Sequence, residues 1–436
     1  MASVHLTRAI RASTSCLRHE LRRATLSYNN ASVSSRSTYA TVAATGETKP
    51  KKRAYKKKTD SAAPSVKLSP EDIAASYKES TNNFTELPPD EEWKTAFPTV
   101  REHAQRVAVR SPEVAKQLAE SIAPEGSKDL IIIEASPGPG LLSRALLNLP
   151  KERVKKLILL DSSPIFLPYL KPLESLDSRV SVFPYDAFNW ATYKKIKDEK
   201  ALDEVETCDD WSQVHPQLRF TMTMSANVHG EQMASQLIRA VSDRQWLFQY
   251  GRVPLNLILQ ARMYDRLKAE PETSNRCKVS VMAQCNATLT ELVPYDDLQP
   301  YHEKFHPARV GHASTARHTE LDARRVSSPL VAIQCIPKEK PVIAPGDLDF
   351  WDYCVRKLFV QKATPLSKSI TALGPGANNL LKTLEATESP NYVDTSKASR
   401  ALDLQDWSRV VNTFKEWPFR PTDLSIDNLF MRRKHD

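Results

Sequence analysis

The sequence predicts an α/β fold: a doubly wound, mainly parallel seven-stranded sheet followed by a small C-terminal helical domain. Apolar runs of strand length alternate with amphipathic helical stretches between residues 111 and 269, which is typical of parallel strands joined by helices. Residues 130–133 form an unbroken apolar run, as expected of a strand buried on both faces. Beyond Pro345 the apolar spacing becomes helical.

The elements can be assigned in chain order. Ser111 and Pro112 are the residue types preferred at the N-cap and first position of a helix, and the apolar residues of 114–122 fall on one face of it. The strand at 130–133 leads through a glycine-containing turn into a helix at 141–149. We expect further strands at 156–160, 180–184, 218–224 and 245–250, helices at 231–242 and 254–269, β-rich segments at 277–293 and 329–336, and C-terminal helices at 348–373 and 397–416.

Length and composition exclude several classes of protein. With 436 residues, of which 41% are hydrophobic, the chain is long enough for one large core and a smaller satellite domain. No window approaches 18 uncharged apolar residues, so membrane insertion is not expected. The six cysteines never fall at CxxC spacing, which argues against a metal site or a disulfide framework and fits a reduced compartment.

The basic charge of the chain is concentrated at its N-terminus. The formal net charge is +9, but residues 1–58 contain 13 Lys and Arg residues and only two acidic residues. The remainder holds 48 basic and 50 acidic side chains and therefore has a net charge of −2. The basicity of the whole chain is thus no evidence that its folded body binds nucleic acid.

Residues 1–45 have the composition of a mitochondrial transit peptide. Residues 1–40 contain six arginines, eight serines, no lysine and one acidic residue. An ordinary basic tail fits the same composition. We expect cleavage between Arg36 and Gly46, and hence location in the mitochondrial matrix. Residues 46–90 are interpreted as a flexible polybasic linker, whose lysines either contact phosphates or are simply solvated. The folded parts expected are 91–345 and the helical 346–436.

Residues 134–140 (EASPGPG) predict a turn that a ligand can approach closely. The chain has only ten glycines, and two of them, Gly138 and Gly140, lie in this turn. Taken alone, the pattern fits a plain tight turn equally well. Asp161 and Asp186, however, follow the next two predicted strands, where carboxylates accept hydrogen bonds from a ribose or an adenine edge. No phosphate-binding lysine follows the turn, which favours S-adenosylmethionine over a nucleotide.

Several segments together resemble the rRNA adenine N6-dimethyltransferases, which have the Rossmann-like fold of S-adenosylmethionine-dependent methyltransferases. Residues 134–147 (EASPGPGLLSRALL), 159–170 (LLDSSPIFLPYL) and 182–190 (VFPYDAFNW) resemble the first three motifs of that family. Residues 278–294, 305–307 and 326–337 look like its closing strands, and 353–381 resembles its C-terminal helical domain. The ending 417–419 (WPF) and the insertion at 191–216 are most similar to fungal mitochondrial members, which include mitochondrial transcription factors of the B type.

The resemblance implies a cofactor site for S-adenosylmethionine. Its residues in this chain are Glu134, Ser136, Gly138, Gly140, Asp161, Asp186 and Asn227. Two of the positions differ from the family pattern, because Ser136 stands where the family usually has glycine and Ser163 where it usually has a second acidic residue. The β-hydroxymethyl group of Ser136 is expected to crowd the methionine end of the cofactor without excluding it.

The catalytic motif departs further from the family pattern. After the fourth strand the family carries Asn-Leu/Ile-Pro-Tyr/Phe, in which the ring stacks on a flipped adenine and the Asn accepts hydrogen bonds from its N6 amine. Here Asn227 is present, but His229 and Gly230 replace the proline and the aromatic residue. We expect methyl transfer to be weak or absent. Restoring Pro and Tyr at these two positions is expected to raise any trace activity.

Two functions follow from the resemblance. The first is a transcription initiation factor that binds the mitochondrial RNA polymerase and melted promoter DNA, and the degenerate motif favours it. The second is an active dimethyltransferase acting on rRNA of the small ribosomal subunit. Nucleic-acid contacts are expected from a basic connection and from two further basic clusters, although each also fits a solvated surface. The connection contains Arg309, Arg317, Arg324 and Arg325, and the other clusters are Arg356, Lys357 and Lys362 and the tail residues Arg432, Arg433 and Lys434.

Overall fold

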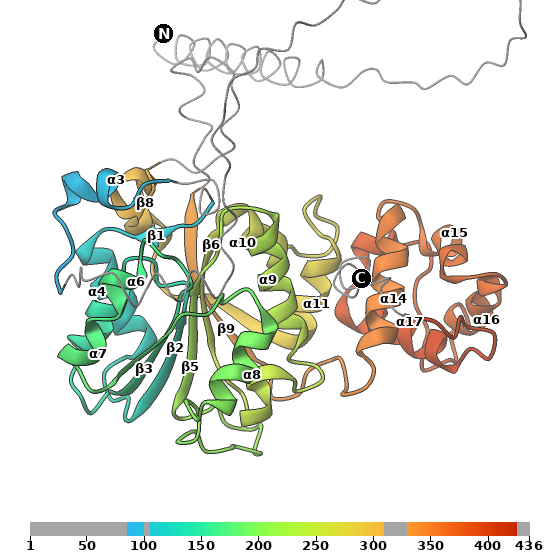
Figure 1. Cartoon of the computed structure of the whole chain (residues 1–436). Helices are drawn as coiled ribbons and strands as arrows, with labels where there is room; N and C mark the ends of the chain where they lie inside the picture. The colour runs from blue at the N-terminus through green and yellow to red at the C-terminus, as the bar shows by residue number, and fades with distance from the viewer. Residues whose placement is uncertain (1–84, 100–104, 309–328, 425–436) are drawn as a thin grey trace, which may run out of the picture. The chain divides into compact units, whose positions relative to one another are not determined.

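The computed structural model describes residues 85–99, 105–308 and 329–424, all within the compact unit Leu68–Asp436. Its main sheet comprises β2 (Leu130–Ala135), β3 (Val154–Leu160), β4 (Val180–Phe183), β5 (Leu218–Thr223), β6 (Leu255–Gln260), β7 (Ala287–Glu291) and β9 (Leu330–Pro337). The strand order is β4-β3-β2-β5-β6-β9-β7. The first five strands are parallel, and β9 is antiparallel to both β6 and β7. The predicted fold class is confirmed (Figure 1).

The helices alternate with these strands along the chain. Those longer than one turn are α4 (Pro112–Ile122), α5 (Leu141–Leu147), α8 (Trp190–Asp198), α9 (Val228–Arg239), α10 (Ala261–Leu267), α11 (Lys278–Asn286), α14 (Leu348–Leu358) and α17 (Leu404–Glu416). Single turns are α3 (Trp93–Ala96), α6 (Leu167–Leu170), α7 (Leu173–Leu176), α12 (Tyr301–Lys304), α15 (Leu366–Ser369) and α16 (Leu381–Leu384). Short 3-10 helices are η1 (Asp90–Glu92), η3 (Trp246–Tyr250), η4 (Tyr295–Leu298), η5 (Phe359–Gln361), η6 (Ile370–Leu373), η7 (Ala377–Leu380) and η8 (Ser399–Ala401).

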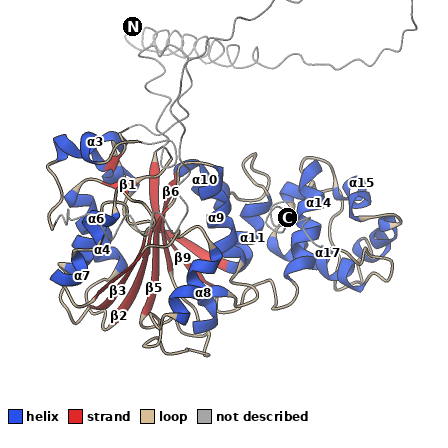
Figure 2. Ribbon diagram, in the orientation of Figure 1, coloured by secondary structure: helices blue, strands red, loops and turns tan. Residues whose placement is uncertain are grey.

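The unbroken apolar sequence of β2 is explained by burial on both faces. Ile131 and Ile133 pack in one core with α8 and α9, whereas Leu130 and Ile132 pack in a second core with α4 and α5. Figure 2 shows the sheet between these two helical layers. Successive side chains of a strand point to opposite faces, so a strand with helices on both sides needs apolar residues at every position.

The N-terminus of α4 forms as the residue types predict. The Ser111 side chain accepts a hydrogen bond from the Val114 amide at 3.3 Å, and Pro112 occupies the first helical position. Just before the helix, Ala108 and Val109 form the short strand β1, which pairs with β8 (Phe305–His306) in a separate antiparallel sheet. This second sheet brings the segment before α4 to the loop that follows β2.

Three segments differ from the prediction. We expected a strand at 245–250, but this segment forms the 3-10 helix η3 (Trp246–Tyr250). We expected a helix over 254–269, but residues 255–260 form the buried strand β6. We expected a β-rich segment at 277–293, but residues 278–286 form the helix α11. Helix α11 contributes Ala283 to one core, and Val281 and Cys285 to another. Because it is buried on two sides, its sequence lacks the single apolar face that marks a helix.

The C-terminal segment is helical, as the sequence predicts. Its helices, together with part of α11, enclose a third core around Trp407, Leu358 and Phe414. The proposed boundary between 345 and 346 stays a prediction. The transit segment 1–45 and most of the linker 46–90 lie outside the described residues. None of the helices in the described part of the chain is long and apolar enough to cross a membrane.

We predict that alanine at Gly140 destabilises the protein more than alanine at Gly126. Both glycines have a φ of +87°, so both substitutions carry the same left-handed backbone cost of roughly 1–2 kcal/mol. A Cβ at Gly140 would also lie 2.6 Å from the Leu170 side chain, whereas nothing lies within 4 Å of one at Gly126. Urea unfolding of the two variants measures the difference. Equal losses would show that Leu170 moves aside freely.

Candidate functional site

The loop after β2 turns sharply with three residues in left-handed conformation. Ser136 has a φ of 57°, Gly138 of 64° and Gly140 of 87°. A Cβ at Gly138 would lie 2.6 Å from the Ala108 Cβ, so this glycine allows β1 to pack directly on the loop. Ser136 holds a backbone conformation that suits glycine. A residue with a side chain in this conformation costs about 1 kcal/mol.

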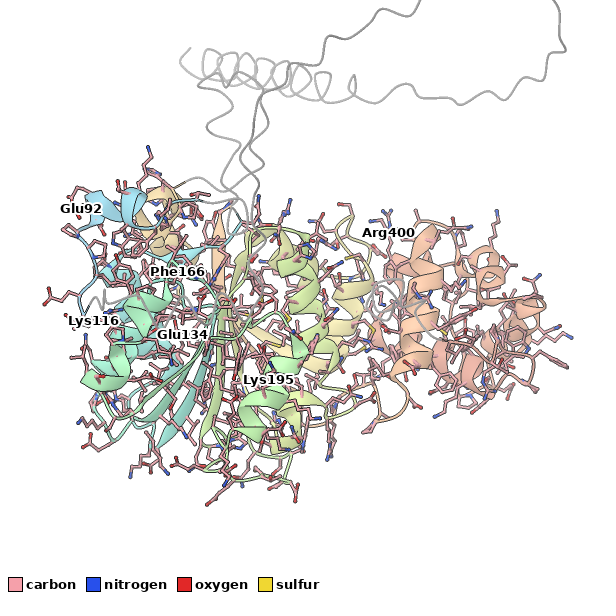
Figure 3. The ribbon with its side chains drawn as sticks, in the orientation of Figure 1. Glu92, Lys116, Glu134, Phe166, Lys195 and Arg400 are labelled. Carbon is pink, nitrogen blue, oxygen red and sulfur yellow. The ribbon has the colours of Figure 1, made fainter. Side chains whose placement is uncertain are left out.

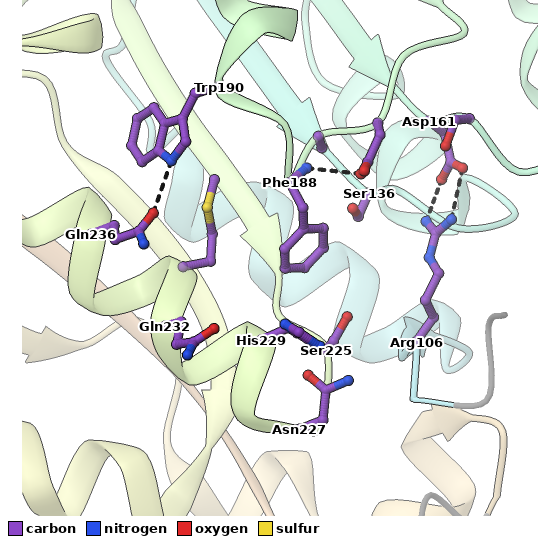
Figure 4. Close-up of a pocket in the computed structure, with 14 residues that line it drawn as sticks. Arg106, Ser136, Asp161, Phe188, Trp190, Ser225, Asn227, His229, Gln232 and Gln236 are labelled. Atoms are coloured by element: carbon purple, nitrogen blue, oxygen red, sulfur yellow. Dashed lines mark hydrogen bonds and ion pairs between the residues drawn. The ribbon is translucent and has the colours of Figure 1, made fainter. Parts of the chain in front are cut away.

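An open pocket lies at the carboxyl ends of β2, β3, β4 and β5 (Figure 4). Its volume is about 520 Å³. This is the edge at which open parallel sheets bind ligands, because the loops of neighbouring strands diverge there. The lining residues are Arg106, Ser136, Asp161, Ser162, Asp186, Ala187, Phe188, Trp190, Ser225, Asn227, His229, Gln232, Met233 and Gln236.

Four of the seven predicted cofactor residues line this pocket together: Ser136, Asp161, Asp186 and Asn227. The other three lie beside or behind it and support the loop. Gly138 donates its amide to Asp161 at 3.3 Å, and Gly140 is the N-cap residue of α5. Glu134 is buried and accepts a hydrogen bond from the Ser143 hydroxyl at 2.6 Å. It lies in the interior of the protein, unlike the exposed Lys116 (Figure 3).

Asp161 has a partner that the sequence analysis did not identify. Arg106 donates hydrogen bonds to both of its carboxylate oxygens, at 2.8 and 2.5 Å. The guanidinium carbon of Arg106 also lies 5.0 Å from the centre of the Phe166 ring. Burial alone lowers the pKa of Arg106, but the charge and hydrogen bonds of Asp161 outweigh it and raise that pKa. The two residues are 55 positions apart, and no local pattern marks Arg106.

The side chains of Asp186 and Asn227 accept hydrogen bonds from nearby backbone amides and so hold the backbone around the pocket in place. An Asp186 oxygen accepts from the Phe188 amide at 2.9 Å, and the Asn227 oxygen accepts from the Gly230 amide at 3.1 Å. Asn227 is therefore the N-cap of α9. Phe188 and Trp190, which the sequence analysis quoted within a motif but did not single out, present aromatic rings at the pocket. The Trp190 indole donates to Gln236 of α9 at 2.8 Å.

The turn between β5 and α9 has no room for a side chain at position 230. A Cβ on Gly230 would lie 2.0 Å from the Ser225 carbonyl oxygen and 3.0 Å from its carbon. Both are backbone atoms, which a rotamer change cannot relieve. The expectation that Pro and Tyr at 229 and 230 would raise methyl transfer stays a prediction, and the present path of this turn opposes it. An aromatic residue at 230 requires a different backbone path, not only a different side chain.

The residues present do not fit S-adenosylmethionine as they are arranged. Asp161, the predicted ribose acceptor, already receives donors from Arg106, Gly138 and Ser163. The Ser136 side chain lines the pocket where a glycine would leave space.

Within the described ranges, no group of three or more His, Cys, Asp or Glu side chains is placed to hold a metal ion.

The predicted nucleic-acid residues are only partly described. Arg309, Arg317, Arg324 and Arg325, like the tail residues 432–434, lie outside the described residues. In the C-terminal helices, Arg356 and Lys357 lie 5.7 and 5.4 Å from the centre of the Tyr353 ring. Lys362 donates to the Ser274 carbonyl at 2.7 Å. These three side chains thus have partners within the protein.

Comparison with known proteins gives a consistent set of relatives. The family model for ribosomal RNA adenine dimethylase matches residues 106–409. Mitochondrial transcription factor 1 of Lachancea kluyveri is 23% identical over 301 residues, 69% of this chain and 84% of that protein. Mitochondrial dimethyladenosine transferase 1 of Vermamoeba vermiformis is 21% identical over 325 residues, 66% of this chain and 83% of that protein. A dimethyladenosine transferase structure from Plasmodium falciparum aligns with a TM-score of 0.46 and 16% identity, covering 71% of this chain and 97% of that one.

We predict that Glu134→Gln removes a pH dependence of stability. Burial, reinforced by the charge of Asp161 and opposed by the Ser143 hydrogen bond, raises the pKa of Glu134 from 4.5 to about 7. The folded protein therefore holds this proton more tightly than the unfolded chain. The raised pKa of Glu134 therefore stabilises the folded protein in full below pH 4.5, and this stabilisation is lost as the pH rises through 7.

Chemical unfolding across pH 4 to 8 tests this expectation. Above pH 7 the Glu134→Gln variant should be more stable than the wild type by on the order of 2–3 kcal/mol. Glu388→Gln, at an exposed position, is the control and should follow the wild-type curve. Parallel curves for wild type and Glu134→Gln would mean that folding does not raise the pKa of Glu134.

Proposed function

Because the chain belongs to the ribosomal RNA adenine dimethylase family, we propose that it is a mitochondrial transcription initiation factor built on that fold. It would confer promoter recognition and opening on the mitochondrial RNA polymerase. The alternative is an S-adenosylmethionine-dependent dimethyltransferase of small-subunit rRNA. Relatives with both names match over similar lengths, at 23% and 21% identity, so overall similarity does not separate the two functions.

The observation that carries the proposal is the turn at Gly230. Base-modifying enzymes of this kind hold the flipped base by stacking and accept hydrogen bonds from the amine that gains charge in the transition state. A Cβ at position 230 would meet the Ser225 carbonyl at 2.0 Å, so the stacking residue has no place in this backbone. The Asn227 oxygen, the remaining acceptor, receives the Gly230 amide at 3.1 Å. The missing stacking residue favours binding without methyl transfer, and the bond from Gly230 takes one of the two acceptor positions of the Asn227 oxygen.

The pocket nevertheless offers what an unstacked base needs. Phe188 and Trp190 line it together with His229 and Gln232 of α9 (Figure 4). Stacking on an aromatic ring is worth about 1–3 kcal/mol per base and does not depend on sequence or cofactor. Melted promoter DNA is therefore a suitable ligand for this lining. Arg309, Arg317, Arg324 and Arg325 remain our candidates for phosphate contacts.

The alternative function has one observation in its favour. Asn227 keeps its place at the end of β5 and lines the pocket, as the catalytic asparagine of the family would. A carboxamide oxygen has two lone pairs, so the bond from Gly230 leaves one acceptor position. Methylation of rRNA is accordingly the second candidate.

The proposed location is the mitochondrial matrix. The arginine-rich, acid-poor composition of residues 1–40 supports import, and relatives that match this chain are named as mitochondrial. We propose that the mature protein begins between Arg36 and Gly46.

The proposal predicts promoter-dependent initiation without methylation. The purified mature protein should enable the mitochondrial RNA polymerase to initiate on a promoter duplex, and should matter much less on a bubble that is already melted. In a parallel assay with S-adenosylmethionine, it should leave the small-subunit rRNA hairpin unmodified. Stoichiometric N6-dimethylation would promote the alternative function. A polymerase that initiates equally well on the duplex alone would remove the transcription role.

We further predict that the pocket aromatics support promoter opening. Phe188→Ala and Trp190→Ala should each reduce open-complex formation by about 5- to 100-fold, since each removes one stacking surface. Tyr295→Ala is the matched control, because this ring is 38% exposed and lies outside the pocket lining. A fluorescent base at the melted positions reports opening directly. If the control and the pocket variants behave alike, the pocket does not hold the melted strand.

A further inference from the structure

Donors of the protein itself occupy the hydrogen-bond acceptor positions of the Asp161 carboxylate. One oxygen accepts from Arg106 at 2.8 Å and from the Ser163 amide at 2.8 Å. The other accepts from Arg106 at 2.5 Å and from the Gly138 amide at 3.3 Å. A carboxylate has about four lone-pair positions, so these donors leave none for a ligand. The Asp161 side chain has no exposed surface.

The guanidinium of Arg106 makes the contacts that a ribose would make. A vicinal diol presents two O–H donors side by side, and a carboxylate accepts them with its two oxygens. The forked guanidinium of Arg106 presents two N–H donors, on Nη1 and Nη2, with the same parallel arrangement. Its positive charge strengthens both bonds. Figure 4 shows the fork facing Asp161 at the pocket wall. Arg106 thus occupies the ribose position on Asp161.

Arg106 is held at this position from two further sides. Its guanidinium carbon lies 5.0 Å from the centre of the Phe166 ring, and its side chain is only 17% exposed. Two residues later, Ala108 pairs with His306 in the small sheet and packs on Gly138 of the loop. The backbone that carries the arginine is therefore anchored to the same loop that a cofactor would contact. Displacing the fork requires breaking a buried ion pair.

We propose that Arg106 is the specificity residue of this pocket. By taking the place of the ribose diol on Asp161, it excludes S-adenosylmethionine and other free ribosides. The rest of the lining, with Phe188 and Trp190, stays open to an unstacked base of a nucleic-acid strand, and this last clause rests on the function proposed above. The other interpretation of the pair is a salt bridge that only satisfies a buried carboxylate, and it predicts no change in ligand preference.

The test compares three ligands on the purified protein by calorimetry and thermal shift. Arg106→Gln should bind S-adenosylmethionine and adenosine about tenfold or more tightly than the wild type, because two charge-assisted hydrogen bonds no longer compete. Its affinity for 2′,3′-dideoxyadenosine, which lacks the diol, should not change. Arg110→Gln is the matched control, since Arg110 bonds to the Asp90 and His302 carbonyls and lies outside the pocket lining.

Arg106→Lys covers the case in which the glutamine variant does not fold. It keeps a positive charge beside Asp161 but loses the fork, so adenosine should bind more tightly than in the wild type while dideoxyadenosine does not. Tight binding of adenosine by the wild type, or an equal gain for the dideoxy compound, would overturn the proposal. Promoter opening by the wild type, measured on the same preparation, separates this outcome from a failure of the transcription role.

Discussion

Strand β2 is hydrogen-bonded along its length to β3 on one side and to β5 on the other, and its side chains enter two cores alternately. A slip of one residue would exchange the two faces, so its register is strictly held. The loop that begins at Ser136 is therefore fixed beside the ends of both neighbouring strands. For this reason Asp161 and Asn227 line the same pocket as Ser136 of that loop.

The pocket differs at two places from what methyl transfer to a base needs. Ser136, at the start of the loop, holds a left-handed backbone of the kind that glycine adopts most readily. At one end, Arg106 occupies the carboxylate that a ribose would use. At the other end, Gly230 packs so closely on Ser225 that no stacking residue fits. These two changes act on different parts of a methyl-transfer site, and both leave the aromatic lining accessible to a base.

Helix α9 links this pocket to the C-terminal helices. It begins at Asn227 beside the pocket, and near its end the Arg239 guanidinium donates to Asp352 of α14 at 2.7 Å. Lys278 of α11 lies 2.9 Å from the other Asp352 oxygen, and the Asp352 side chain is almost fully buried. The two cations together compensate the charge of this buried carboxylate. Helix α9 thus joins the pocket to the C-terminal helices through the buried carboxylate of Asp352.

The sequence by itself determined the parallel sheet, the loop after β2 and the strand-end acids, because periodicity, glycine and capping residues act within a few positions. It also identified Asn227 and the loss of the aromatic residue after it. Only the tertiary structure decided that Arg106 pairs with Asp161 across 55 residues, and that Ser225 leaves no space at Gly230. The tertiary structure also decided that residues 278–286 form the helix α11, which is buried on two sides, and that residues 246–250 form the 3-10 helix η3. In each case the deciding contact comes from a separate part of the fold or from the exact path of the backbone, neither of which a local pattern records.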